Sequence, residues 1–140
     1  MARCFAMSAE NELQEDEVKE HLRKCLEAKG WCPKIAQGKS RGIDIEALRE
    51  GKRWVIEVKG CGSRDAMRVN YFLTALGELL QRMNDPSAKY SVAFPDLVQF
   101  RRLWKQLPKF AKERTGVNCL FVRANGEVDE VNHAGDAQEA

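Results

Sequence analysis

Two acidic residues and a lysine have the types and spacing that metal-assisted hydrolysis uses: Asp44, Glu57 and Lys59. They lie in two short apolar runs separated by Glu50-Gly51, a pair typical of a tight hairpin turn. With this two-residue turn, the numbers of facing residues sum to 101, so Asp44 faces Glu57. Because side chains alternate along a strand, Lys59 points the same way as Glu57.

This arrangement places two carboxylates opposite each other, with an ammonium group beside them. Like charges that face each other across strands repel by up to about 1 kcal/mol, and a shared proton or a cation relieves the repulsion. Mg²⁺ binds one or two carboxylates together with water and phosphate oxygens. We therefore expect Asp44 and Glu57 to bind Mg²⁺ (or Mn²⁺) for phosphodiester hydrolysis, with Lys59 stabilising the developing charge. The alternative is a solvated strand face, and a shift of one residue in the register would remove the pairing.

The other face of the predicted hairpin is apolar and should belong to the core. Three apolar pairs fall on it: Ile43 with Val58, Ile45 with Ile56, and Ala47 with Trp54.

Hydrophobic periodicity predicts the elements that position this hairpin. Helices are expected from about Ser8 (as N-cap) or Asn11 to Lys29, from about Arg68 to Met83, and from Leu97 to about Arg114, where Pro108 kinks or splits the helix. Further strands are expected at Trp31–Ile35, Tyr90–Phe94, Val117–Arg123 and Val128–Val131, the last two joined at Asn125-Gly126. This order predicts an α/β sandwich, in which helices flank a mixed sheet. We expect one domain over residues 1–140, with an ordered core of about 9–131.

Composition narrows the classes of function. The chain has 140 residues, a net charge of +2 and five cysteines without a C-x-x-C pair, and no apolar run is long enough to span a membrane. We expect a reduced, cytoplasmic protein without a secretory signal, a membrane partner or a structural zinc. Any nucleic-acid surface must be a local patch, because the whole molecule is not strongly basic. The sequence contains no P-loop, dinucleotide fingerprint, G-x-S-x-G or H-E-x-x-H motif.

Gly42-Ile43-Asp44, followed by residues 54–60 (WVIEVKG), resembles the PD-(D/E)XK nuclease superfamily. The similarity covers roughly residues 11–83, and the closest pattern is that of archaeal-type Holliday junction resolvases and Mrr-like restriction endonucleases. Ile43 replaces the proline of the family's name. The resemblance implies a restriction-endonuclease-like three-layer sandwich and a Mg²⁺-dependent nuclease that cuts DNA in repair, recombination or restriction.

In this superfamily a preceding helix often contributes a glutamate. Glu15 falls on the same helical side as Val18, Leu22 and Cys25, so the resemblance makes Glu15 a fourth catalytic candidate beside Asp44, Glu57 and Lys59. The competing interpretation is an acidic residue that is stabilised near a helix N-terminus.

Four basic residues are close enough to the hairpin in sequence to contact DNA phosphates: Lys39, Arg41, Arg64 and Arg68. The basic run from Arg101 to Lys112 is instead expected to be a solvated face of the third helix. Two alternatives remain open. The chain could be an inactive nucleic-acid-binding or protein-interaction module, and the second helix with Trp104 could form a homodimer surface.

Overall fold

The computed structural model describes residues 11–36 and 42–132. Its helices are α2 (Glu15–Ala28), α3 (Asp65–Arg82), α4 (Val98–Gln106) and α5 (Lys109–Thr115). Its strands are β1 (Cys32–Ile35), β2 (Ile45–Arg49), β3 (Lys52–Val58), β4 (Lys89–Pro95), β5 (Asn118–Val122) and β6 (Val128–Val131).

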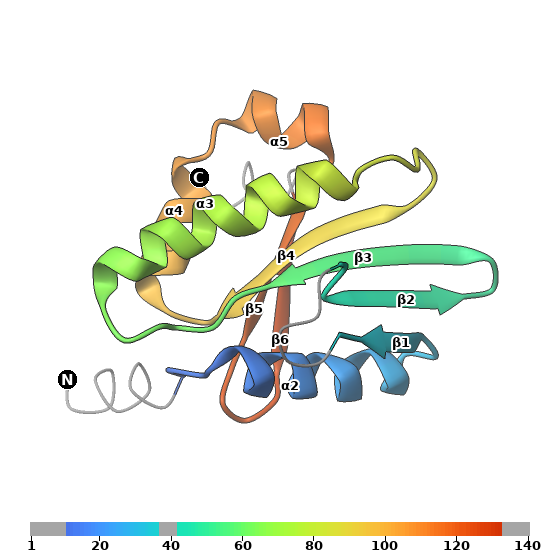
Figure 1. Cartoon of the computed structure of the whole chain (residues 1–140), viewed down its shortest axis with the longest axis horizontal. Helices are drawn as coiled ribbons and strands as arrows, with labels where there is room; N and C mark the ends of the chain where they lie inside the picture. The colour runs from blue at the N-terminus through green and yellow to red at the C-terminus, as the bar shows by residue number, and fades with distance from the viewer. Residues whose placement is uncertain (1–10, 37–41, 133–140) are drawn as a thin grey trace.

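The strands form one six-stranded sheet in the order β1-β2-β3-β4-β5-β6. The three strands β3, β4 and β5 run parallel, and antiparallel hairpins extend the sheet at both edges. Helix α2 covers one face of this sheet, and α3, α4 and α5 lie on the other (Figure 1). The predicted mixed sheet flanked by helices is confirmed.

Each face of the sheet has its own apolar core. Beneath α2 lie Val18, Leu22 and Leu26 of the helix, packed with hairpin residues such as Ile45 and Ile56. The core between the sheet and helices α3 and α4 contains five large aromatic residues: Phe72, Phe94, Phe100, Trp104 and Phe121. Strand β3 is buried on both faces from Trp54 to Val58, whereas β2 leaves Leu48 exposed.

Helix boundaries differ from the expected ones at two ends. Helix α2 begins at Glu15 rather than at Ser8 or Asn11, because the Gln14 backbone N–H donates to Glu17 and caps the helix there. Ser8 lies outside the described residues. Helix α3 begins at Asp65, three residues before the expected start. The predicted break at Pro108 is confirmed, since α4 and α5 are separate helices on either side of it.

The β2–β3 hairpin has the predicted register. Ile45 pairs with Ile56 and Ala47 with Trp54, as a turn at Glu50-Gly51 requires. Both turn residues have positive φ, 51° and 78°, which matches the right-handed twist of the flanking strands. The expected pairing of Ile43 with Val58 is wrong, because β2 begins only at Ile45.

Ile43 packs against the core beneath α3 instead of the core beneath α2. The chain therefore changes direction just before β2. Asp44 lies at this change of direction, between the two layers of helices.

Candidate active site

The end of the β2–β3 hairpin brings Asp44 and Glu57 together. Asp44 Oδ2 accepts a hydrogen bond of 2.8 Å from the backbone N–H of Val58, and the Asp44 carbonyl accepts one of 2.9 Å from Ala36. These bonds hold Asp44 between β1 and β3. Its side chain is then close enough to hydrogen-bond to the carboxyl group of Glu57.

Glu57 is buried, with only 1% of its surface exposed. Burial, the hydrogen bond to Asp44 and the negative charge of Asp44 raise the pKa of Glu57 to about 8, although the Arg82 guanidinium opposes them. At neutral pH Glu57 therefore retains its proton, which relieves the repulsion expected between facing carboxylates.

Arg82, near the end of α3, is the cation that holds Glu57 in place. Its Nε lies 3.1 Å from Glu57 Oε1, and it also donates to the Gly42 carbonyl at 3.0 Å. Arg82 thus links α3, β3 and the segment that leads into Asp44. Sequence reasoning missed this residue.

Lys59 lies one residue beyond β3 and is tied to α3 by Glu78. Lys59 Nζ is 3.3 Å from Glu78 Oε1, and its side chain is largely covered. Partial burial disfavours the charged form, but the negative charges of Glu78, Glu15 and Asp44 outweigh this effect and raise the pKa of Lys59 above its ordinary value. Lys59 is therefore a fixed positive charge at neutral pH.

Helix α2 adds Glu15 and Lys19 to this group. Lys19 Nζ lies 3.2 Å from Glu15 Oε2 and 3.9 Å from Asp44 Oδ1, and it donates to the Ala36 carbonyl at 3.1 Å. The electrostatic effect of Glu15 on Lys59 places Glu15 beside the site as well. Lys19 is almost fully buried, and sequence reasoning missed it.

A glycine makes the approach of α2 possible. A Cβ on Gly60 would lie 2.4 Å from the backbone N of Glu15 and 2.8 Å from the carbonyl carbon of Gln14. No side chain fits there, so only glycine lets the start of α2 pack against the chain that leaves β3. The contact is fixed further by a 2.9 Å hydrogen bond from the Cys61 N–H to the Leu13 carbonyl.

The residues present suit a hard divalent cation. Asp44 and Glu57 offer adjacent carboxylate oxygens, and the pKa of Glu57 stays raised by burial and by Asp44 even with the Arg82 guanidinium beside it. Among residues 11–36 and 42–132, no group of three or more His, Cys, Asp or Glu side chains is arranged around a metal position. Two carboxylates completed by water and phosphate oxygens are the usual Mg²⁺ arrangement, whereas zinc requires more protein ligands.

The four basic residues expected to contact DNA have different surroundings. Arg64 is exposed just before α3. Arg68 is occupied: it donates to the Cys61 carbonyl and forms ion pairs with Asp65 and Glu12. The other two, Lys39 and Arg41, lie outside the described residues.

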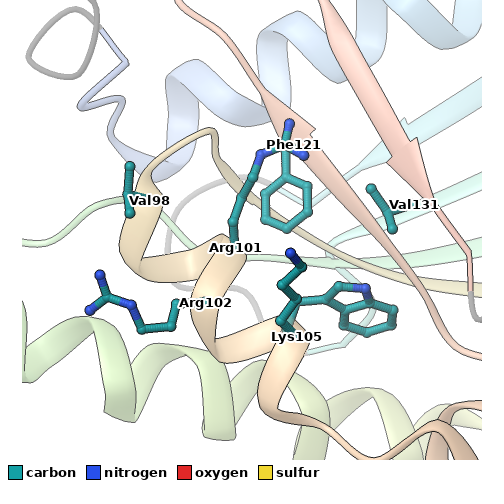
Figure 2. Close-up of a pocket in the computed structure, with 7 residues that line it drawn as sticks. Val98, Arg101, Arg102, Lys105, Phe121 and Val131 are labelled. Carbon is teal, nitrogen blue, oxygen red and sulfur yellow. The ribbon is translucent and has the colours of Figure 1, made fainter. Parts of the chain in front are cut away.

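A separate pocket of about 320 Å³ lies between α4 and the β5–β6 edge. Phe121 and Val131 line it from the strands, and Lys105 points into it from α4 (Figure 2). Arg101 closes one side through ion pairs with Asp96 and Asp129. No carboxylate of the described residues lines this pocket, so the carboxyl pair at the end of the hairpin remains the candidate metal site.

The basic run of the third helix is therefore only partly a solvated face. Arg102, Lys105 and Lys109 are exposed. Arg101 is held in ion pairs, and the buried Lys112 lies over the Trp104 ring at 4.5 Å. For these two residues the expectation was wrong.

Replacing Glu57 by Gln is expected to flatten the dependence of stability on pH. Because the folded-state pKa is near 8 and the ordinary value is 4.5, the wild-type protein loses stability as pH rises from about 4.5 through 8. The glutamine side chain stays uncharged at every pH, so the variant does not lose this stability. Above pH 8 its free energy of unfolding, compared with that of the wild type, should therefore be higher by about 2–4 kcal/mol than the same comparison gives at low pH. Urea unfolding from pH 5 to 9 measures this. The exposed turn variant Glu50→Gln should follow the wild type, and equal pH slopes for Glu57→Gln and wild type would contradict the assignment.

No helix among residues 11–36 and 42–132 is long and apolar enough to cross a membrane.

The chain matches no protein-family model and no curated protein sequence. Two solved structures share its fold. An XisH family protein from Nostoc punctiforme is 23% identical over 83% of this chain and 99% of its own, with a TM-score of 0.59. An fdxN element excision controlling factor protein from Anabaena variabilis is 22% identical over 84% of this chain and 99% of its own, with a TM-score of 0.57. At such identities the likeness shows a common fold.

Proposed function

We propose that this chain is a divalent-metal-dependent phosphodiesterase that hydrolyses DNA. The observation that carries the proposal is the contact between Asp44 and Glu57, with the charged Lys59 held beside them. A buried carboxyl pair that retains a proton at pH 7 is costly for folding, and such groups gather at functional sites. The descriptions of the structural neighbours support a role in controlling DNA excision, and repair, recombination and restriction are related settings.

Each residue has a distinct part in the proposed chemistry. Asp44 and Glu57 would hold Mg²⁺ or Mn²⁺, which supplies an acidified water and screens the phosphate charge. Lys59 stabilises the negative charge that develops on the phosphate oxygens. Glu78 and Glu15 keep Lys59 protonated, and Lys19 positions Asp44 and Glu15 relative to each other.

A second candidate is a binding module that has this fold without activity. One observation favours it: both carboxylates already have cationic neighbours within the protein, Arg82 at Glu57 and Lys19 at Asp44. These neighbours could serve as a permanent substitute for the metal. DNA binding without cleavage would then be expected.

A cleavage assay distinguishes the two functions. Purified protein is incubated with end-labelled duplex, branched and single-stranded DNA, with Mg²⁺, with Mn²⁺ or with a chelator. We expect cleavage of at least one substrate that depends on the metal and is lost in Asp44→Asn. The matched control is Glu46→Gln, which changes a carboxylate two residues further along the chain, in β2, that pairs with Arg53. If no substrate is cut, or if Asp44→Asn cuts as the wild type does, the nuclease proposal fails. Gel-shift binding without cleavage would then support the binding module.

A further inference from the structure

Helix α3 has an apolar face that is buried in the core and a second apolar set beside it, of which Leu76 also packs against the core. The inner face buries Phe72, Ala75 and Leu79. A second set of apolar residues follows the outer side: Val69, Leu73, Leu76 and Leu80, here called the outer stripe. Leu73 is 59% exposed and Leu80 is 51% exposed. A helix that is apolar on two sides is typical of one that lies between a core and another protein surface.

The spacing of the outer stripe indicates what covers it. The four residues follow one another at intervals of four, three and four, which is the heptad pattern of a helix that packs against another helix. Helix α3 has 18 residues and is therefore about 27 Å long, so the stripe runs along most of its length. Its Leu76 and Leu80 border a pocket shared with Leu107 and with Ala111 of α5.

The charge distribution favours a second copy of this chain as the partner. Glu78 is the only charged residue between Val69 and Gln81, and at 3.6 residues per turn it lies roughly opposite the stripe. The residues beside the stripe on its exposed side are uncharged: Asn70, Thr74, Gly77 and Gln81. A neutral surface gives no charge pattern that would select a different protein, and it meets its own copy without repulsion.

The stripe also matches itself under twofold symmetry. In an antiparallel pair with its axis between Thr74 and Ala75, Val69 meets Leu80 and Leu73 meets Leu76. Every facing pair is then apolar. Gly77 has open space where a side chain would lie, which allows the two helices to approach closely.

A pocket beside the stripe adds to the same surface. It has a volume of about 120 Å³, and Leu76 and Leu80 form one wall while Leu107 and Ala111 form the other. Nearby on α5, Phe110 is exposed. Trp104, expected to belong to the dimer surface, is instead buried in the core, where its ring lines this pocket and the one beside β5 and β6.

We propose that two copies of this chain associate as an antiparallel, twofold-symmetric dimer through the outer stripe of α3. Stable dimers bury about 800 Å² on each partner, and a single helix face supplies less than that even with α5 beside it. The association is therefore expected in the micromolar range. Because Glu78 and Lys59 lie on the other side of α3, both candidate active sites remain open in the dimer.

Sedimentation equilibrium of the full chain, from about 1 to about 500 µM, tests this proposal. The wild type should pass from monomer to dimer, and Leu73→Glu should weaken association by at least about tenfold, because it buries an unpaired charge. Leu48→Glu is the matched control: Leu48 is 52% exposed on β2, away from α3. Leu73→Gln tests the same contact with an uncharged side chain, and thermal unfolding checks that each variant is folded.

Three outcomes would overturn the proposal. The wild type stays monomeric over the whole concentration range, both Leu73 variants still form the dimer, or Leu48→Glu weakens association as much as Leu73→Glu does. Asp44→Asn should dimerise as the wild type does. The proposed dimer and the proposed nuclease activity can therefore be refuted independently of each other.

Discussion

Replacing Lys59 with Met is expected to lower the rate of DNA cleavage by about 100- to 1000-fold and to leave the affinity for Mg²⁺ or Mn²⁺ nearly unchanged. Lys59 is a fixed charge, since Glu78 and Glu15 hold its pKa above the ordinary value. Methionine keeps the length and the apolar stem of the side chain and removes only the ammonium group. Because Asp44 and Glu57 are retained, the proposed metal ligands stay in place. Single-turnover cleavage at saturating metal gives the rate, and calorimetric titration gives the metal affinity.

Lys52→Met is the matched control, because Lys52 is an exposed lysine at the other end of the same strand. It should cut DNA as the wild type does. A Lys59→Met protein within tenfold of the wild-type rate would contradict the assigned role. Loss of metal binding together with activity would instead mean that Lys59 supports the carboxylates rather than the substrate charge.

Replacing Gly60 with Ala is expected to lower the free energy of unfolding by about 3 kcal/mol. The added Cβ would stand 2.4 Å from the Glu15 backbone N, so the first turn of α2 must move away. This displacement would also carry Glu15 and Lys19 away from the site. We therefore expect weaker cleavage in the fraction that remains folded. Urea unfolding of dilute protein measures the loss of stability.

Gly77→Ala provides the comparison for that experiment. Gly77 lies within α3, and nothing stands within 4 Å of the position its Cβ would take. Alanine is the better helix former there, so this variant should be more stable by about 0.5–1 kcal/mol. If both alanine variants are equally stable, the close contact at Gly60 is not what positions α2.

The hairpin could be predicted from the sequence because its information is local. Glu50-Gly51 specifies the turn, the turn sets the register, and the register brings Asp44 near Glu57. The burial of Glu57 could not be predicted in the same way. It depends on α3 crossing over β3, and this contact joins parts of the chain that no local pattern connects.

The same limit applies to the charged neighbours of the site. Arg82 and Glu78 are one turn apart on α3, and Lys19 is one turn after Glu15 on α2. Their spacing shows that each pair shares a helix face, but it does not show which face meets the hairpin. The apolar residues of α3 show the same limit. Their periodicity predicts a helix with one apolar face, whereas in the structure they form an inner buried set and an outer, more exposed set.

The ion pairs around the hairpin leave the site electrically balanced. Lys19, Lys59 and Arg82 provide three positive charges, while Glu15, Asp44 and Glu78 provide three negative charges when Glu57 retains its proton. A phosphodiester approaching this centre therefore meets no surplus of positive charge. The attraction for a polyanion must come from a cation held by the carboxyl pair, or from basic groups outside this cluster such as Arg64. The proposed nuclease would therefore select its substrate through the cation bound at its centre before DNA arrives, rather than through a permanent affinity for DNA.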